Sequence, residues 1–395
     1  MARCRINGDA TKNWYVAMAQ RPSFSAQDRN GRPRVDGGKA PAQASGELFA
    51  ALDLGTNSCR MLIARPDGAQ FRIIDAFAKS VRLGAELERS GTLTRSSVER
   101  TIRALQVCAS KLRKLNVTHS RLVATEACRR AKNGPSFLRQ VRKRTGLDLE
   151  LIAPEEEARL AVISCAPLVH RESDHVMVFD IGGGSTELVW IDVSTVEPAL
   201  RAEAVMQLTM RPNGMNGVRE GQANVIDFIS VPLGVATLHE KFHDVEDESA
   251  RFALMSWFFE EQLSKFRPYM DLNVLDGVNG FQMIGTSGTV TTVAASHLGL
   301  KRYDRRKVDG ISMTEAEIEK VISRLMSLGA EGRQRDPSIG RDRAELIMSG
   351  AAILQTLLRL WPTNRLGVAD RGLREGILYS MMNARGLLKP EPSND

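Results

Sequence analysis

Two stretches decide the fold: DLGTNSCR at 53–60 and DIGGGSTEL at 180–188. Each begins with an aspartate that follows an apolar segment, and each then places glycine, hydroxyl and polar residues in close succession. A second apolar segment follows in both, so each stretch has the pattern of a strand, a glycine-containing turn and a return strand. The recurrence predicts an internal duplication in which two related domains face each other.

Outward from these stretches, short apolar strands alternate with amphipathic helices, which predicts α/β architecture. In the first part, strands are expected over 48–55, 58–64, 71–81, 121–127 and 149–154, with a helix over 97–115. In the second part, strands are expected over 175–184, 185–193 and near 202–208. The last third is expected to be mainly helical, over 248–266, 287–297, 314–328, 343–360 and 373–384, with strands at 281–287 and 365–370.

Length and composition fit a globular chain of two to three domains. Of the 395 residues, 43% are hydrophobic and 26% are charged. The five cysteines are widely spaced and include no CxxC pair, so neither a disulfide framework nor a cysteine zinc site is expected. No apolar run is long enough to span a bilayer and no secretory signal is recognised. We therefore expect a cytoplasmic protein without a membrane partner.

The basic charge is concentrated at the start of the chain. Residues 1–46 carry a net charge of +5 out of the total +7, which leaves only +2 for the rest. That remainder is too small for a nucleic-acid surface, so no sequence-specific nucleic-acid partner is expected. We expect 1–46 to be a disordered basic tail, with a targeting or RNA-binding arm as the alternative. An N-terminal domain is expected over 47–158, and a C-terminal domain with helical additions over 159–390.

The two repeated turns have the composition of a phosphate cradle. Glycine lets the backbone approach a ligand closely, and successive N–H groups can converge on an anion. Ser58, Ser185 and Thr186 can add hydroxyl donors, and Asp53 and Asp180 can hold Mg²⁺ directly or through its waters. Either turn alone is also typical of ordinary structure, whereas the matched pair favours a phosphate site.

A third glycine-rich turn, GTSGT at 285–289, lies between an expected strand and an expected helix. Its N–H groups, around Ser287 and Gly288, could meet another phosphate, although the same residues would also suit a helix-capping turn.

Between the repeats, PEEEAR at 154–159 opens an expected helix. Three successive carboxylates there could simply complement the helix dipole. A carboxylate at the junction of two phosphate-binding domains could also accept a proton from the water that attacks phosphorus. We take Glu157 as the candidate base.

The densest basic segment is 121–146, with eight basic side chains and one acidic one. Arginine presents a fork that matches phosphate oxygens, so a substrate with several phosphates could find counter-charge here. A solvated helix face is the alternative for 139–144. Arg129, just after an expected strand, is the candidate for substrate contact.

His239, Glu240 and His243 satisfy the HExxH pattern of zinc proteases. Glu260 or Glu261 would have to supply a third ligand without a supporting motif, so we favour a chance match.

Taken together, the motifs resemble those of the Ppx/GppA family of exopolyphosphatases and guanosine pentaphosphate phosphohydrolases, in a short two-domain form. The resemblance covers about 48–384. It is carried by DLGTNSCR at 53–60, ATEACRRAKN at 124–133, PEEEAR at 154–159, DIGGGSTEL at 180–188, GTSGT at 285–289 and GLREGIL at 372–378. The chain differs from the usual pattern at Thr56 and Ala369, where serine is frequent, and it ends soon after GLREGIL, without the further helical domains of long members.

The resemblance implies two ribonuclease-H-like domains of the actin, sugar-kinase and heat-shock ATPase type around a central cleft. It implies that Glu157 is the catalytic base and that Asp180 and Glu187 lie at a Mg²⁺ or Mn²⁺ ion, to which we add Asp53 from its place in the first turn. The implied phosphate contacts are Gly55, Thr56, Asn57 and Ser58 in the first turn, and Gly182, Gly183, Gly184, Ser185 and Thr186 in the second. Arg129, Ser287 and Gly288 complete the implied substrate site.

The implied reaction is metal-dependent hydrolysis of a terminal phosphoanhydride, which would release orthophosphate from inorganic polyphosphate or guanosine pentaphosphate. A homodimer is expected. Two alternatives remain open: a kinase or ATPase of the same fold, and a non-catalytic regulator that binds an alarmone or polyphosphate.

Overall fold

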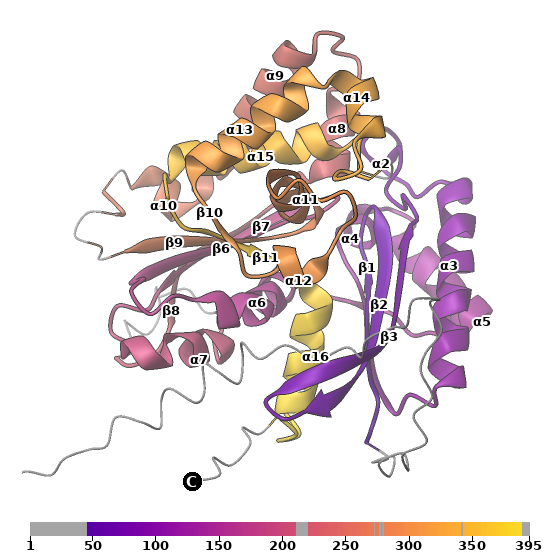
Figure 1. Cartoon of the computed structure of the whole chain (residues 1–395). Helices are drawn as coiled ribbons and strands as arrows, with labels where there is room; N and C mark the ends of the chain where they lie inside the picture. The colour runs from indigo at the N-terminus through magenta and orange to yellow at the C-terminus, as the bar shows by residue number, and fades with distance from the viewer. Residues whose placement is uncertain are drawn as a thin grey trace, which may run out of the picture.

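The computed structural model describes residues 46–210, 220–271, 273–275, 278, 280–340 and 343–388. Apart from Gly46, the predicted tail lies outside the described residues, and its disorder stays a prediction. The described chain contains two β-sheets with helices packed against both (Figure 1).

The first sheet has the strand order β3-β2-β1-β4-β5. Its strands are β1 (Phe49–Leu54), β2 (Ser58–Asp67), β3 (Gln70–Ser80), β4 (His119–Ala124) and β5 (Glu150–Leu151). Apolar residues run without interruption through most of β1 because both faces of this central strand are covered: Ala50 and Leu52 belong to one core, and Phe49 and Ala51 to another. The expected strand at 121–127 ends at Ala124, and the one at 149–154 keeps only two paired residues.

The second sheet repeats this arrangement, with the order β10-β11-β9-β6-β7-β8. Its strands are β6 (His175–Ile181), β7 (Thr186–Asp192), β8 (Asn224–Val231), β9 (Phe281–Thr286), β10 (Ser312–Met313) and β11 (Leu366–Ala369). In both sheets three consecutive strands form an antiparallel meander, and the first of them also pairs in parallel with the next strand of the chain. The predicted duplication is confirmed.

One predicted strand was wrong. The segment near 202–208 forms the helix α7 (Arg201–Met206), and the third strand of the second meander is β8. Ala, Glu and Met in this short segment are helix formers, whereas β8 is rich in β-branched residues.

Helices cover the faces of both sheets (Figure 1). Those of the first half are α2 (Leu87–Ser90), α3 (Arg95–Lys114), α4 (Glu126–Arg130), α5 (Gly134–Thr145) and α6 (Pro154–Cys165). Those of the second half, besides α7, are α8 (Val235–Lys241), α9 (Glu248–Glu261), α10 (Arg267–Met270), α11 (Gly288–His297), α12 (Arg305–Val308), α13 (Glu315–Ser327), α14 (Gly329–Arg335), α15 (Ile347–Leu360) and α16 (Leu373–Asn383). None of the helices in the described ranges has the length and apolarity needed to cross a bilayer.

The last helix returns to the first sheet. Ile377 and Leu378 of α16 share a buried core with Phe49 of β1, and α16 lies against α6 at Gly376. A Cβ atom at Gly376 would come within 2.0 Å of the Leu160 carbonyl oxygen, so only glycine allows this close helix crossing. The domain division at 158/159 stays a prediction, but residues near the end of the described chain clearly complete the core of the first sheet.

Candidate functional site

A cavity of about 170 Å³ lies where the turns of the two sheets meet. Most of the predicted site residues line it: Asp53, Gly55, Thr56, Asn57, Ser58, Glu157, Asp180, Gly182, Gly183, Gly184, Ser185, Ser287 and Gly288. The three others, Arg129, Thr186 and Glu187, are not part of its lining. Residues separated by more than 200 positions in the chain thus face one space.

The β1–β2 and β6–β7 turns have the same internal geometry and touch each other. Each is closed by a glycine N–H that donates to a serine carbonyl, from Gly55 to Ser58 at 3.0 Å and from Gly182 to Ser185 at 2.9 Å. A Cβ atom at Gly184 would lie 2.2 Å from the Thr56 Oγ1. Glycine is required there because the first turn occupies the space that a side chain would need.

Both turns expose backbone donors. Their carbonyl oxygens accept hydrogen bonds from behind: Gly182 and Gly183 from the first residues of α8, and Thr56 from the N–H of Gly84. In contrast, within the described ranges the N–H groups of Thr56, Asn57, Gly183, Gly184 and Ser185 donate no hydrogen bond to the protein. N–H groups that converge without acceptors form a site for an anion.

The side-chain hydroxyl of Thr56 is a further unpaired donor. Its hydroxyl oxygen is buried and has no hydrogen-bond partner in the described part of the chain. A buried hydroxyl without a partner costs about 1–3 kcal/mol. A bound phosphate oxygen would satisfy this hydroxyl.

The third glycine-rich turn both caps a helix and faces the cavity. The Ser287 hydroxyl accepts from the N–H groups of Thr289 and Val290 at the start of α11, so this side chain is a helix cap. Ser287 also has a φ of 133°, a strained value for a residue with a side chain. Gly288 keeps its own N–H without a partner among the described residues.

The two turns differ in the charge next to each aspartate. Asp53 lies opposite Arg60 in the β1–β2 ladder, whereas Asp180 lies opposite Glu187 in the β6–β7 ladder. Burial raises the pKa of Asp53, against the opposing charges of Arg60 and Arg374. Burial and the nearby charge of Asp53 together raise the pKa of Asp180 to about 6, against the charge of Arg60. Acidic groups are therefore crowded on the side of the second turn.

Glu187 lies behind the cavity wall. It is buried, and its Oε1 accepts a hydrogen bond from the Ser230 hydroxyl at 2.8 Å. Burial raises the pKa of Glu187 well above its usual value, and the charges of Glu157 and Asp180 raise it further. The neighbouring Thr186 hydroxyl donates to the carbonyl of Leu233 at 2.7 Å, so it points away from the predicted phosphate contact.

Among the three adjacent glutamates of α6, only Glu157 faces the cavity. Glu156 is held by Arg121 and Arg159, each at 2.7 Å, and Glu155 is exposed. Burial raises the pKa of Glu157 to about 7, although Arg129 opposes this shift. A carboxylate with a pKa near neutrality can accept a proton in the working pH range.

Arg129 holds this glutamate in place instead of lining the cavity. Its Nη1 donates to Glu157 at 2.9 Å and to the Ile152 carbonyl at 2.8 Å, and its Nη2 donates to Glu126 at 2.8 Å. Glu126 itself lines the cavity. Arg129 therefore ties α4 to the first turn of α6 and sets the orientation of the candidate base.

Two carboxylates of the cavity are suited to hold a divalent cation. Asp53 and Asp180 line the cavity from opposite turns, and Mg²⁺ favours one or two carboxylates that it shares with waters and substrate oxygens. The crowding of like charges around Asp180, which burial intensifies, is the environment that a cation would relieve. Among the residues that the structure describes, no group of three or more His, Cys, Asp or Glu side chains has the arrangement of a protein-only metal site. A shared site with substrate oxygens fits this arrangement.

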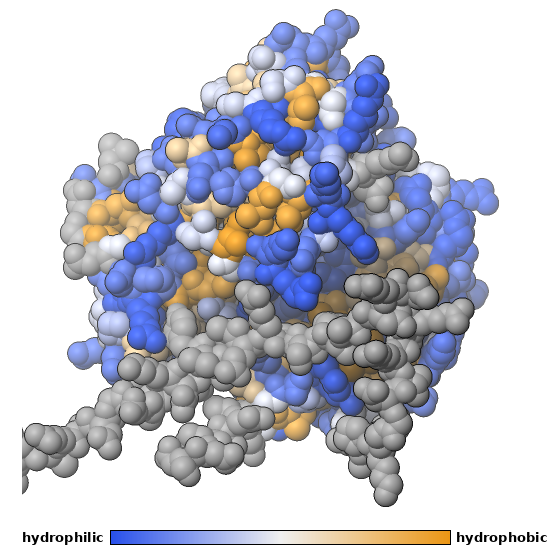
Figure 2. All heavy atoms as spheres, in the orientation of Figure 1, coloured by the Kyte–Doolittle hydropathy of each residue, from blue (hydrophilic) through white to orange (hydrophobic). Residues whose placement is uncertain are grey.

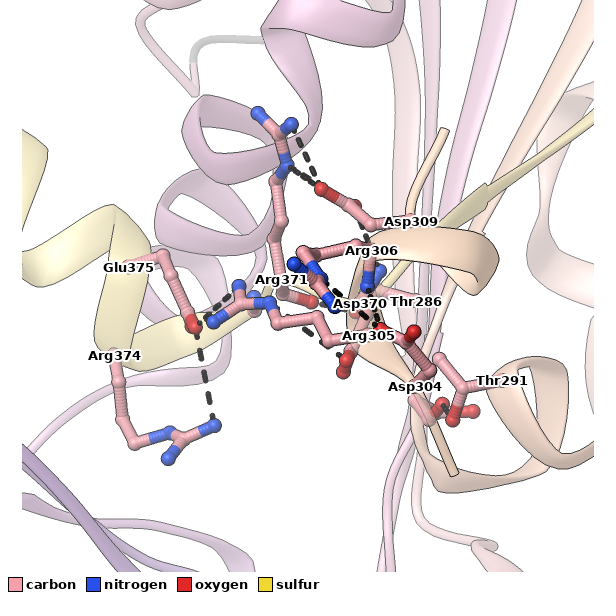
Figure 3. A network of polar contacts seen from close by, with 12 residues as sticks. Thr286, Thr291, Asp304, Arg305, Arg306, Asp309, Asp370, Arg371, Arg374 and Glu375 are labelled. Carbon is pink, nitrogen blue, oxygen red and sulfur yellow. Dashed lines mark hydrogen bonds and ion pairs between the residues drawn. The ribbon is translucent and has the colours of Figure 1, made fainter. Parts of the chain in front are cut away.

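The cavity lining also includes charged residues that sequence reasoning did not select, among them Arg60, Asp370 and Arg374. Asp370 follows β11 in the way that Asp53 and Asp180 sit at the ends of β1 and β6, so the segment RLGVAD carried a usable signal. Figure 3 shows these C-terminal residues in a network of arginines and carboxylates, with Arg371 paired to Asp309 at 2.9 Å and Arg305 paired to Glu375 at 3.0 Å.

Among the described residues, those of the HExxH pattern do not join a group of three side chains that could hold a metal ion. Helix α8 ends at Lys241, before His243, whose Nδ1 contacts the Glu240 carbonyl at 2.8 Å. Glu260, one of the suggested third ligands, is paired with Arg359. This geometry supports the interpretation of a chance match.

Comparison with known proteins gives a consistent result. The Ppx/GppA phosphatase family matches residues 62–385. A crystal structure of the Aquifex aeolicus member of that family is 29% identical with a TM-score of 0.65, over 86% of this chain and 98% of that chain. A structure of the Aquifex aeolicus PPX-GPPA enzyme is 30% identical with a TM-score of 0.64, over 85% and 99%.

An exopolyphosphatase from Cytophaga hutchinsonii shares the fold at 21% identity, with a TM-score of 0.70 over 86% of this chain and 98% of that chain. Together with the two duplicated sheets, these structures confirm the predicted pair of ribonuclease-H-like domains of the actin and sugar-kinase type.

Proposed function

Because the chain belongs to the Ppx/GppA phosphatase family, we propose that it hydrolyses the terminal phosphoanhydride bond of inorganic polyphosphate or guanosine pentaphosphate and releases orthophosphate. The observation that carries the proposal is the meeting of the two turns, whose unpaired N–H groups face the same cavity as Glu157.

Glu157 is the proposed proton acceptor. Its carboxylate takes a proton from a water molecule as the water oxygen bonds to the terminal phosphorus and the bond to the bridging oxygen breaks. A positioned general base contributes about 10² to 10⁴ in rate. Arg129 fixes the orientation of the Glu157 carboxylate and keeps its pKa from rising further.

The turns stabilise charge on the phosphoryl group. N–H groups of Asn57 and Gly183 donate to non-bridging oxygens from opposite sides, and the Thr56 hydroxyl finds its missing acceptor there. Preorganised donors of this kind are each worth about 10² to 10³ in rate, because they need no reorganisation during the reaction.

Asp53 and Asp180 are the residues that would hold Mg²⁺ or Mn²⁺, with Glu187 behind Asp180 as a supporting carboxylate. When bound, such an ion supplies charge neutralisation for the phosphate oxygens and the leaving group.

Phosphate release should be measured with Mg²⁺ on long-chain polyphosphate, tripolyphosphate and guanosine pentaphosphate in parallel. We expect release from at least one of the three. Inertness on all three would favour the non-catalytic regulator, and phosphate transfer from ATP that depends on an added acceptor would favour the kinase. Cytoplasmic location and a homodimer remain part of the proposal.

The variant Glu157→Gln tests the assigned base. It keeps the size of the side chain but cannot accept the proton, so we expect kcat to fall by about 10² to 10⁴ while the substrate still binds. Turnover at the wild-type rate in this variant would contradict the assignment. Glu155→Gln, on the same helix turn but exposed, is the matched control and should keep its activity.

A further inference from the structure

The outer helices of the first domain carry a concentration of positive charge that the proposed reaction does not use. Residues 95–145 contain fourteen Lys or Arg and only two Asp or Glu. The segment therefore carries a net charge of +12, although residues 47–395 as a whole carry only +2. Helices α3 and α5 pack side by side at the outer edge of this domain (Figure 1). The corresponding edge of the surface is mostly hydrophilic (Figure 2).

Part of this charge is not neutralised by neighbours. Arg103 and Arg113 of α3, and Arg139 and Lys143 of α5, are exposed, and none of the four makes a salt bridge within the described part of the chain. We call these four residues the α3–α5 face. Elsewhere on the same helices, Glu99 pairs with Arg144 at 2.5 Å. That pair links the two helices and leaves no further acidic side chain on α3 or α5.

A row of basic residues connects the cleft to α5. Arg129 of α4 contacts two cavity-lining carboxylates, Glu126 and Glu157. Arg130, which pairs with Glu88 at 2.6 Å, and the exposed Lys132, which makes no salt bridge within the described ranges, follow immediately and lead into α5. With 3.8 Å between successive Cα atoms, Lys132 lies at most about 11 Å from Arg129. A polyanion that leaves the cleft along α4 therefore reaches α5 within a few of its own charged groups.

The amino-acid composition of the α3–α5 face favours a chain of phosphates over a nucleic acid as its partner. Recognition of nucleic-acid bases outside a duplex needs aromatic platforms. Helix α3 has no aromatic residue, and the single one of α5, Phe137, is buried. Binding by repeated basic side chains without base contacts suits a chain of phosphates, and α3 alone is about 30 Å long.

We propose that the α3–α5 face is an exosite for long-chain polyphosphate, which holds the remainder of the chain outside the cleft while its terminal phosphate occupies the site between the turns. This inference rests on the proposed function and deepens it: substrates long enough to reach the face gain affinity, and tripolyphosphate does not.

The test compares two variants that lose the same charge at different places. The first is Arg103→Gln/Arg113→Gln/Arg139→Gln/Lys143→Gln. The control, Lys265→Gln/Arg267→Gln/Lys320→Gln/Arg335→Gln, removes four exposed basic residues from the second half of the molecule. Circular dichroism and melting temperature establish that both fold. The readouts are the Kd of end-labelled long-chain polyphosphate at two salt concentrations, and phosphate release from tripolyphosphate.

The α3–α5 variant should bind long-chain polyphosphate about tenfold more weakly, with a shallower salt dependence, while its tripolyphosphate turnover matches the wild type. The control should stay within about twofold of the wild-type Kd. Equal Kd values for both variants would overturn the exosite. Single-stranded RNA of equal charge that binds more tightly than polyphosphate, and loses affinity in the same variant, would overturn the choice of partner. No phosphate release from any substrate, with the difference in Kd intact, would instead refute the proposed function.

Discussion

The β1–β2 turn and the β6–β7 turn are copies of one motif, but they have different roles in the site. Both place an aspartate on the strand, a glycine after it and a serine that closes the turn. The first turn keeps the side chains of Thr56 and Asn57, while the second has glycine at the two corresponding positions. The first turn fills the space that the second leaves open, so two equal copies become one asymmetric anion site.

The difference extends to charge. The position opposite the aspartate is Arg60 in the first copy and Glu187 in the second. The first copy is therefore close to neutral, whereas the second carries two carboxylates next to Glu157. The duplication gives both turns the same backbone geometry. Differences at a few positions make the first turn suited to donate hydrogen bonds to an anion and the second turn suited to hold a cation.

The largest effect is expected from filling the open space of the second turn. Gly184→Ala would place a Cβ atom 2.2 Å from the Thr56 Oγ1, which must push the turns apart. We expect kcat/KM to fall by about 10², the cost of a displacement near 1 Å in an active site. Gly55→Ala is the matched control in the first turn, where a Cβ atom would meet nothing closer than 3.7 Å.

If the collision with Thr56 is the cause, Gly184→Ala should lower the melting temperature less in a Thr56→Ala background than in the wild type. An equal loss in both backgrounds, or a Gly55→Ala variant as damaged as Gly184→Ala, would show that the two turns do not differ in the way described.

A smaller effect is expected from the two residues that differ in charge. Arg60 lowers the pKa of both Asp53 and Asp180, so Arg60→Gln should shift the acid limb of the kcat against pH profile toward higher pH. Burial and the charges of Glu157 and Asp180 raise the pKa of Glu187 well above its usual value, so Glu187 keeps its proton along that limb and Glu187→Gln should leave the limb in place. A shift of similar size in both variants would contradict the assigned asymmetry.

The smallest effect is expected on stability without divalent cations. Burial raises the pKa of Glu157 to about 7 and that of Asp180 to about 6. A raised pKa in the folded state means that the folded protein binds more protons, so this contribution to stability is complete below about pH 4 and is lost as pH rises through 6 to 7. The melting temperature of the wild type, relative to Asp180→Asn, should therefore fall between pH 5 and pH 8. A difference that is constant with pH would contradict the buried charge cluster.

Sequence patterns predicted the fold well because they repeat. Strand, turn and strand occur twice, and apolar runs such as that of β1 require cover on both faces. The exception was α7, a six-residue helix too short to show a helical period. The return of α16 to the first sheet was also out of reach, since it depends on contacts between residues more than 200 positions apart.

Gly183 and Gly184, which the repeated pattern singles out, line the cavity with their backbone. The directions of side chains were harder to foresee. Arg129 turned out to orient Glu157, and the Thr186 hydroxyl turned out to bond the Leu233 carbonyl, because the direction of a side chain depends on neighbours that the local sequence does not contain. Arg60 was missed although it lies within a quoted motif, since its role depends on the ladder partner Asp53.

The most direct measurement is a crystal structure of the Glu157→Gln variant with tripolyphosphate and Mg²⁺. The terminal phosphate should accept hydrogen bonds from N–H groups of both turns, at Asn57 and at Gly183, with the substituted side chain at position 157 facing its phosphorus across a water molecule. A terminal phosphate held by one turn alone, or bound away from both, would contradict the account.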